Sequence, residues 1–278
     1  MEPTSSPWCQ SFGVALLAVA GVLLGRWFSH FPKPYWTLGY FLPLLLITLI
    51  VVTGRKPELM FVPPTSWLTR GRTPCAVMGF IATVILTTPL PRLANIRSRV
   101  MINLLMTWIV AQISVWPFLA PAFNQRYLAC LKTNIDADGV CRQSNEYNCG
   151  PAAAVTALRK LGFSAEEGQI AILARTSSAT GTPPDMLADA LRQHYGGQGL
   201  VCEYRLFKDV AQLRSAGLTL AVIEFAFMVD HYVLILEVTD QQVIIADPLS
   251  GKRVLSQKEF KRIWRSLGIV LRRQANKG

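Results

Sequence analysis

The first 120 residues of this 278-residue chain almost lack acidic side chains. Glu2 and Glu58 are the only two, beside 9 Lys and Arg, whereas residues 121–278 hold 15 acidic and 19 basic residues. A surface exposed to water needs more charges than the first part offers, while the second part has the charge of an ordinary soluble domain. The basic residues of the first part lie between apolar runs, which points to lipid head groups and disfavours a nucleic-acid binder.

Several short motifs are also missing. Residues 1–11 contain no Lys or Arg, so the first apolar run lacks the basic flank of a cleavable signal peptide. No G-x-x-x-x-G-K-[ST] phosphate loop occurs in the sequence. The sequence therefore gives no support for ATP-driven transport by this chain. The cysteines lack the spacing of a zinc site, and we expect no metal or nucleotide cofactor.

Four apolar runs fill the first part of the chain, at 11–28, 35–53, 74–90 and 101–120. Each has the length at which a helix crosses a hydrocarbon core of about 30 Å, and aromatic residues cluster near their ends, as in interfacial belts. We therefore predict an all-α transmembrane region over residues 1–120, in a multi-pass protein of a bacterial inner membrane. The alternative is a buried helical bundle of a soluble protein, which would need a charged outer face.

Four spans place both termini on one side of the membrane, but the basic residues do not decide which side. Seven flank one side and five the other, too small a difference for the positive-inside rule. The flanks of the first helix, taken alone, favour an extracytoplasmic C-terminal domain. Cys130 and Cys141 bear on the same question, because a disulfide between them would imply an oxidising compartment. Two free thiols are the alternative.

Residues 143–278 are predicted to form one α+β domain behind a linker at 121–142. Helical patterns come first and strand patterns later, which favours helices packed on an antiparallel sheet. Ser164 with Glu167, and Ser256 with Glu259, have capping-box spacing. The expected elements are helices at 151–161, 164–175, 184–195, 209–215 and 256–264, strands at 200–206, 218–225, 231–238, 242–246 and 268–272, and a turn at 248–251.

Cys149 has the surroundings of a nucleophile. It precedes Gly150 and Pro151, and proline suits the first turn of a helix because its missing N–H costs nothing there. The positive end of the helix dipole favours the thiolate form of a cysteine at that position. Gly150 would leave room for a substrate backbone beside the sulfur. The alternative is a buried, inert cysteine at the start of a core helix.

His231 and Asp247 are candidate partners of that thiol. His231 begins an apolar strand and Asp247 ends the next one, so antiparallel pairing brings both to the same end of the sheet. A carboxylate there can orient an imidazole that serves as general base to a thiol. Gln143, six residues before Cys149, offers an amide that could hold an oxyanion together with the Cys149 N–H. Purely structural roles are the alternative for these residues, and His194 is interpreted as a surface residue.

Together these residues resemble a known family. The papain-like cysteine peptidase domain of bacteriocin-processing ABC transporters is similar in three segments, RQSNEYNCGPAAAVTALRKLGF, DHYVLILEV and VIIADPLSGKRVLSQKEFKRIW. The resemblance implies cleavage of leader peptides after a double glycine. It also implies roles for four residues: nucleophile Cys149, base His231, orienting carboxylate Asp247 and oxyanion donor Gln143. The chain departs from the family in having Asn148 where an Asp usually precedes the cysteine, and in having four spans ahead of the domain.

We therefore predict a membrane-anchored cysteine peptidase with a papain-like α+β domain behind four transmembrane helices. Its substrate would be a peptide or a protein segment near the membrane, and a separate transporter or secretion component is a candidate partner. Three alternatives remain: a papain-like module that binds peptides without cutting them, an acyl-transfer enzyme with the same triad, and a four-span membrane protein whose tail is incidental. The intact set of four candidate residues argues against the first, and the completeness of the soluble domain argues against the last.

Overall fold

The structure, a computed structural model, describes residues 6–226 and 229–274 of the chain. The chain divides into two compact units, Met1–Ala122 and Phe123–Gly278. The first unit contains helices and no strand among its described residues, and the second combines helices with a sheet.

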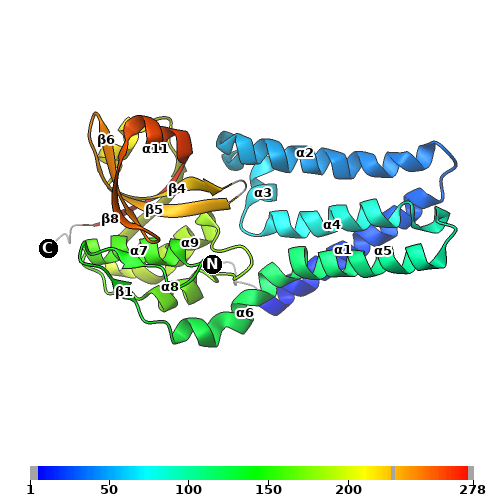
Figure 1. Ribbon diagram of the computed structural model, residues 1–278, viewed down its shortest axis with the longest axis horizontal. Helices are drawn as coiled ribbons and strands as arrows, with labels where there is room; N and C mark the ends of the chain where they lie inside the picture. Colours follow the sequence, from blue (N-terminus) through cyan, green and yellow to red (C-terminus); the bar gives the residue numbers. More distant parts are fainter. Residues whose placement is uncertain (1–5, 227–228, 275–278) are drawn as a thin grey trace. The chain divides into compact units, whose positions relative to one another are not determined.

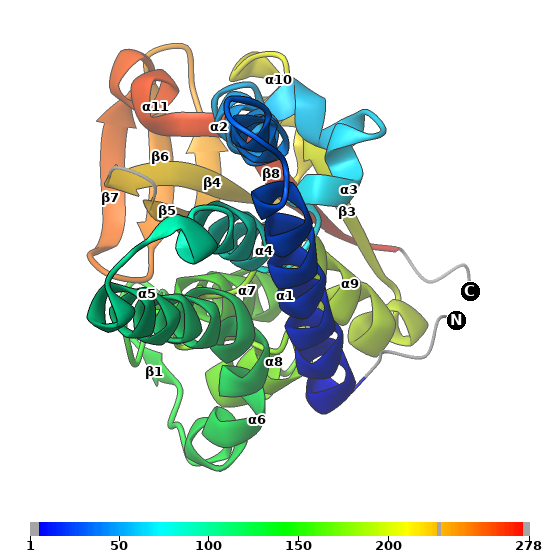
Figure 2. The same cartoon turned by 90° about the vertical axis from the view of Figure 1, so that its right-hand side faces the viewer.

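The long helices α1, α2, α4 and α5 of the first unit run side by side (Figures 1 and 2). Short 3-10 segments, and one π-helical segment, η4, connect or continue them. The bounds in chain order are α1 (Pro7–Ser29), η1 (Tyr35–Tyr40), α2 (Phe41–Arg55), η2 (Pro57–Phe61), α3 (Thr65–Thr69), α4 (Thr73–Thr87), η3 (Leu90–Arg92), α5 (Ile96–Ile109), η4 (Val110–Val115) and α6 (Trp116–Ala129).

Within the described part of the chain, four helical stretches are long and apolar enough to cross a membrane: Pro7–Ser29, Tyr35–Arg55, Thr73–Arg92 and Ile96–Ala129. They overlap the four apolar runs of the sequence. Large apolar side chains are exposed along them, among them Phe12, Leu23, Phe41, Leu44, Met101 and Leu104. A helix facing water would carry polar groups there, so these faces suit contact with lipid.

Small residues let α1 and α4 approach closely. The buried face of α1 consists of residues spaced three or four apart, namely Ser11, Val14, Ala18, Gly21, Gly25 and Ser29. A Cβ atom at Gly21 would overlap the Thr83 Oγ1 atom and stand 2.9 Å from the Phe80 carbonyl oxygen of α4. The glycine is therefore required for this contact, because any Cβ atom would clash with α4. Close packing of this kind is how helices associate in lipid.

The fourth apolar stretch is longer than the predicted 101–120. α5, η4 and α6 follow one another without a break over 34 residues, which is about 51 Å at a rise of about 1.5 Å per residue. In η4 the Ser114 hydroxyl donates to the Cys75 carbonyl at 2.8 Å, beside Gly79, where a Cβ atom would overlap the serine side chain. A hydrocarbon core of about 30 Å cannot hold this length upright, and residues 123–129 belong to the second unit.

The strands of the second unit form an antiparallel sheet. In the described residues its order is β3-β8-β4-β5-β6-β7. The strand bounds are β3 (Leu200–Leu206), β4 (Leu218–Ala226), β5 (Val229–Val238), β6 (Gln242–Asp247), β7 (Gly251–Ser256) and β8 (Trp264–Arg273). The helix bounds are α7 (Cys149–Lys160), α8 (Glu167–Leu173), α9 (Pro184–Tyr195), η5 (Gly196–Gln198), α10 (Ala211–Ala216) and α11 (Gln257–Ile263).

The central strands of this sheet are buried on both faces. α7 lies against β4 and β5, and α9 lies against β3 (Figure 1). A second apolar cluster forms around Phe207, Phe260 and Trp264. Residues 219–223 of β4 are buried one after another, as expected for a strand covered on both sides. The predicted α+β fold, with helices packed on an antiparallel sheet, is confirmed.

Local details differ from the sequence prediction in two places. The predicted linker at 121–142 holds the end of α6 and a short antiparallel pair, β1 (Asn134–Ile135) and β2 (Cys141–Arg142). The predicted turn at 248–251 leads directly into β7, which the sequence analysis missed because only one of its residues, Gly251, is buried. The predicted capping box at Ser256 is present.

Candidate active site

Cys149 is the first residue of α7, directly after the N-cap Asn148, and its thiol is half-buried. Gly150 differs from the sequence expectation. A Cβ atom there would lie 3.3 Å from Leu187 Cδ2 and 3.3 Å from the Tyr232 ring, inside the domain. The absence of a side chain at Gly150 therefore lets α7 pack closely on β5, and it does not open space for substrate beside the sulfur.

The register of β5 and β6 brings His231 and Asp247 together. Leu234 stands opposite Ala246, so Val233 is opposite Asp247, and His231 is the diagonal neighbour of Asp247 on the same face. The His231 Nε2 atom lies 2.8 Å from Asp247 Oδ1, and the two residues are 6% and 4% exposed. A buried imidazole and a buried carboxylate therefore meet at one end of the sheet.

The turn after β6 fixes the Asp247 carboxylate. The Leu249 N–H donates to Oδ1 at 2.8 Å, and the Ser250 hydroxyl donates to Oδ2 at 2.6 Å. Burial by itself would raise the pKa of Asp247, but the hydrogen bonds from His231, Ser250 and Leu249 lower that pKa well below its ordinary value. The carboxylate is therefore ionised at neutral pH and oriented toward the imidazole.

The Cys149 side chain lies close enough to the His231 ring to raise the pKa of the imidazole. Because Asp247 engages Nε2, Nδ1 is the ring nitrogen available to the sulfur. Burial lowers the pKa of His231, but the hydrogen bond to Asp247 and the nearby Cys149 side chain, with the charges of both, outweigh it and raise the pKa to about 9. A protonated imidazole between a carboxylate and a sulfur is the state that a thiolate–imidazolium pair requires.

Gln143 lies in the loop before α7, with its side chain turned into that loop. Its Nε2 donates to the Asn145 carbonyl at 2.9 Å, and its Oε1 is buried without a hydrogen-bond partner. Its backbone N–H donates to the Pro248 carbonyl at 3.0 Å. The loop before α7 is thus tied to the turn after β6, and the amide has a second N–H for another acceptor.

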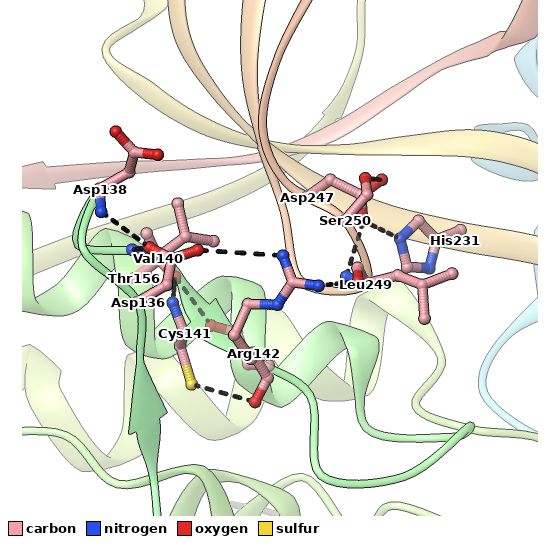
Figure 3. Close-up of polar contacts among 11 residues, drawn as sticks. Asp136, Asp138, Val140, Cys141, Arg142, Thr156, His231, Asp247, Leu249 and Ser250 are labelled. Atoms are coloured by element: carbon pink, nitrogen blue, oxygen red, sulfur yellow. Dashed lines mark hydrogen bonds and ion pairs between the residues drawn. The ribbon is translucent and has the colours of Figure 1, made fainter.

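Arg142 makes a further connection between the same two loops (Figure 3). Its guanidinium donates to the Leu249 carbonyl and lies 3.9 Å from the Asp136 carboxylate. Asp136 holds the β1–β2 connection in place by accepting hydrogen bonds from the N–H groups of Asp138 and Val140. Arg142 therefore joins the segment that leads to Cys149 to the turn that follows Asp247.

Two other cysteines of the second unit, Cys141 and Cys202, are buried. Burial raises the pKa of the Cys141 and Cys202 thiols to about 12, which keeps them in the unreactive thiol form. Cys130 is exposed. All six cysteines lie within the described residues and are free thiols, so of the two alternatives for Cys130 and Cys141 the structure has the unpaired one.

Sequence reasoning missed the place of Glu167. α8 begins at Glu167 without a side-chain cap, so the predicted capping box with Ser164 is wrong. The carboxylate is instead fully buried and accepts hydrogen bonds from Ser144 and Asn148, 23 and 19 residues away in the sequence. A capping-box spacing gives no sign of such distant partners. His194 is exposed, as predicted.

The second unit matches the profile of a known peptidase family. The profile of the peptidase C39 family matches residues 138–276, half of the chain. The chain belongs to the peptidase C39 family. Cys149, His231, Asp247 and Gln143 all lie within the segment that matches the C39 profile.

Relatives of this C39 chain include two archaeal proteins. An uncharacterised protein of Methanothermobacter marburgensis is 28% identical over 144 residues, which are 52% of this chain and 95% of the relative. An uncharacterised protein of Methanothermobacter thermautotrophicus is also 28% identical over 144 residues, 51% of this chain and 94% of the relative.

Solved structures similar to this C39 chain include two peptidases from transporters. One is a double glycine motif protease from an AMS/PCAT transporter in complex with the leader peptide, at 16% identity and a TM-score of 0.42, covering 51% of this chain and 94% of that chain. Another is the peptidase domain of Streptococcus ComA, a bi-functional ABC transporter, at 20% identity and a TM-score of 0.42, covering 48% and 96%.

Proposed function

We propose that this protein is a membrane-anchored cysteine peptidase in which Cys149 is the nucleophile, His231 the general base and Asp247 the residue that orients the imidazole. Membership in the peptidase C39 family supports peptidase chemistry. Four apolar helices within the described residues support the anchor. The observation that carries the proposal is the buried His231 ring, which lies 2.8 Å from the Asp247 carboxylate and whose pKa is raised by Asp247 and by Cys149.

In the resting site His231 already holds the proton given up by Cys149, so acylation begins from the thiolate–imidazolium pair. The thiolate attacks a peptide carbonyl carbon, an S–C bond forms, and the π electrons move to the carbonyl oxygen. The Cys149 backbone N–H and the Gln143 amide donate to that oxyanion. The amide does so with its second N–H, or by exchanging its hydrogen bond to the Asn145 carbonyl for one to the oxyanion.

Deacylation reverses these roles with water. Before it, acylation ends when the His231 imidazolium protonates the leaving amine as the C–N bond breaks, which leaves a thioester on Cys149. The neutral imidazole then takes a proton from water, the hydroxide oxygen bonds to the thioester carbon, and the C–S bond breaks to release the acid and the thiol. The negative charge of Asp247 stabilises the imidazolium at each stage where it forms.

The substrate we propose is a peptide or a protein segment that reaches the second unit close to the bilayer. Membership in a peptidase family supports a peptide substrate. A leader peptide ending in a double glycine, delivered to a separate transporter or secretion component, is the specific form of this proposal. Incubating the full chain with such a peptide and weighing the products tests it, because hydrolysis adds water whereas acyl transfer adds an amine.

The second unit is proposed to face the extracytoplasmic side. The flanks of the first helix are the remaining support, since Cys130 and Cys141 are free thiols. A reporter that folds on only one side of the membrane, fused to the C-terminus, tests this proposal. A cytoplasmic signal from that fusion would reverse the assignment.

Alkylation with iodoacetamide tests the proposed nucleophile in the full chain in detergent micelles. Cys130, exposed on the same unit, is the internal reference. At pH 6–7 we expect Cys149 to react at least about tenfold faster than Cys130, because an adjacent imidazole activates a cysteine as a nucleophile. His231→Ala should remove that difference, and Cys149→Ala should remove peptide cleavage. Equal rates at the two cysteines, or cleavage by the Cys149→Ala variant, would refute the peptidase assignment.

A further inference from the structure

A fully buried carboxylate lies beneath the loop that leads into Cys149. Glu167 is 0% exposed, and both of its carboxylate oxygens accept hydrogen bonds from that loop. Oε1 accepts from the Ser144 backbone N–H at 2.9 Å and from Asn148 Nδ2 at 3.0 Å, and Oε2 accepts from the Ser144 hydroxyl at 2.6 Å. A buried charge needs such partners, because an unpaired one is strongly unfavourable.

The two residues held by Glu167 are the sequence neighbours of the two oxyanion donors of the proposed reaction. Ser144 directly follows Gln143, and Asn148 directly precedes Cys149. The carboxylate therefore fixes both ends of the segment that carries the Gln143 amide and the Cys149 N–H. The Glu167 backbone is itself held, because its N–H donates to the Thr133 hydroxyl at 2.9 Å.

The direction of the Asn148 amide is set by this contact. Asn148 is 0% exposed, its Nδ2 donates to Glu167, and its Oδ1 is buried without a hydrogen-bond partner. A carboxylate at position 148 would face the Glu167 carboxylate across a distance of about 3 Å, where two negative charges repel strongly in a buried site. The negative charge of this pair therefore belongs to Glu167, and position 148 supplies the donor.

We propose that Glu167 is a positioning residue for the oxyanion site: it holds the segment from Gln143 to Cys149 in the geometry that receives the oxyanion, and it touches no substrate. The inference rests on the proposed function. Two properties of the site then depend on different residues. Activation of the thiol depends on His231 and Asp247, whereas binding of the oxyanion depends on the loop that Glu167 holds.

Two probes of Cys149 in the full chain in detergent micelles measure these properties separately. Iodoacetamide alkylates the thiolate and forms no oxyanion. A peptide aldehyde ending in Gly-Gly-aldehyde accepts the thiol: an S–C bond forms, the carbonyl π electrons move to oxygen, and that oxygen takes the proton from the imidazolium. The resulting hemithioacetal keeps its oxygen at the donors of the oxyanion site, so its affinity depends on their placement.

Glu167→Gln removes the charge and keeps the volume. We expect the aldehyde to bind about 10- to 100-fold more weakly, an effect no larger than that of removing a whole oxyanion donor. The rate of iodoacetamide alkylation at Cys149 should stay within about twofold of wild type. Glu166→Gln is the matched control, because the Glu166 side chain is 53% exposed and pairs with Arg159; both probes should react with it as with wild type. If Glu167→Gln does not fold, Ser144→Ala removes only the contact to Oε2 and should show the same selective loss at a smaller scale.

A second substitution tests the charge assignment. Asn148→Asp alone should weaken aldehyde binding by bringing two carboxylates together, and adding Glu167→Gln should restore part of it. The inference is overturned if Glu167→Gln binds the aldehyde like wild type, if it loses both probes in parallel, or if it fails to improve the Asn148→Asp protein. A different outcome refutes the proposed function itself: wild-type Cys149 that reacts with neither probe.

Discussion

The charge of Asp247 holds His231 in its protonated form, and Asp247→Asn isolates that charge. The amide keeps an oxygen that can accept from His231 Nε2 and from the Leu249 N–H, both 2.8 Å from Oδ1. The Ser250 hydroxyl, which now donates to Oδ2 at 2.6 Å, can rotate to accept from the new amide N–H. The variant therefore keeps the volume of the side chain and removes one negative charge, which Arg253 Nη1 now faces at 3.5 Å from Oδ2.

The pKa of His231 gives the size of the effect. It is raised to about 9 from an ordinary value of about 6.5, a difference of about 3 kcal/mol in favour of the imidazolium. If the whole rise is lost in Asp247→Asn, the protonated fraction at pH 8 falls from about 0.9 to about 0.03, roughly 30-fold. Cys149 also contributes to the rise, so 30-fold is an upper limit.

Ring-nitrogen NMR of the full chain, labelled at histidine, measures this pKa directly because the chain has 3 histidines. The His231 signal should titrate near pH 9 in wild type and at clearly lower pH in Asp247→Asn. Asp240→Asn is the control, since the Asp240 side chain is 92% exposed on the turn between β5 and β6. A His231 pKa that stays within half a unit of wild type in Asp247→Asn would refute the reasoning.

The pH dependence of folding stability should follow the pKa of His231. The folded-state pKa of His231 lies above its unfolded value, so the stabilisation is fully present below about pH 6.5. It is lost as pH rises through about 9, the folded-state pKa of His231. The denaturation midpoint of wild type should therefore fall across this window, and Asp247→Asn should flatten the decrease. An equal pH dependence in the two proteins would contradict the assignment of the charge to Asp247.

Two further predictions concern glycines at close contacts. Gly150→Ala places a Cβ atom 3.3 Å from the Tyr232 ring and should destabilise the second unit by about 1–3 kcal/mol, measured by chemical denaturation; unchanged stability would show that α7 can shift. Gly21→Ala places a Cβ atom against Thr83 and should lower the thermal midpoint in detergent, whereas Gly13→Ala, with nothing within 4 Å of the added atom, should not. Equal midpoints for these two variants would remove the argument for close packing of α1 on α4.

Much of the fold follows from patterns within single elements. The apolar runs at 35–53 and 74–90 predict helices in lipid because their length and lack of charge are local properties. The strand at 200–206 has the predicted bounds, and α9 begins and ends where its periodicity and flanking glycines predict. β7 was missed because an edge strand with mostly exposed residues has little apolar alternation to recognise.

The candidate site was predicted as a set of residues, and its architecture was not. The order of Cys149, His231 and Asp247 and the pairing of adjacent strands suffice to suggest that the three meet. Gly150 shows where such reasoning stops, because its role is close packing against Tyr232 and that residue lies 82 positions later in the sequence.

The sequence by itself determined the division into an apolar helical part and a more charged α+β part. It also singled out the thiol, the imidazole and the carboxylate, because charge, periodicity and motif order can be recognised within single segments. Only the tertiary structure decided what holds them. Glu167 reaches back 19 and 23 residues to the loop before Cys149, and Arg142 reaches 107 residues ahead to the turn after Asp247. Such contacts depend on how the elements pack, since any buried polar side chain must find its partner wherever the fold brings one.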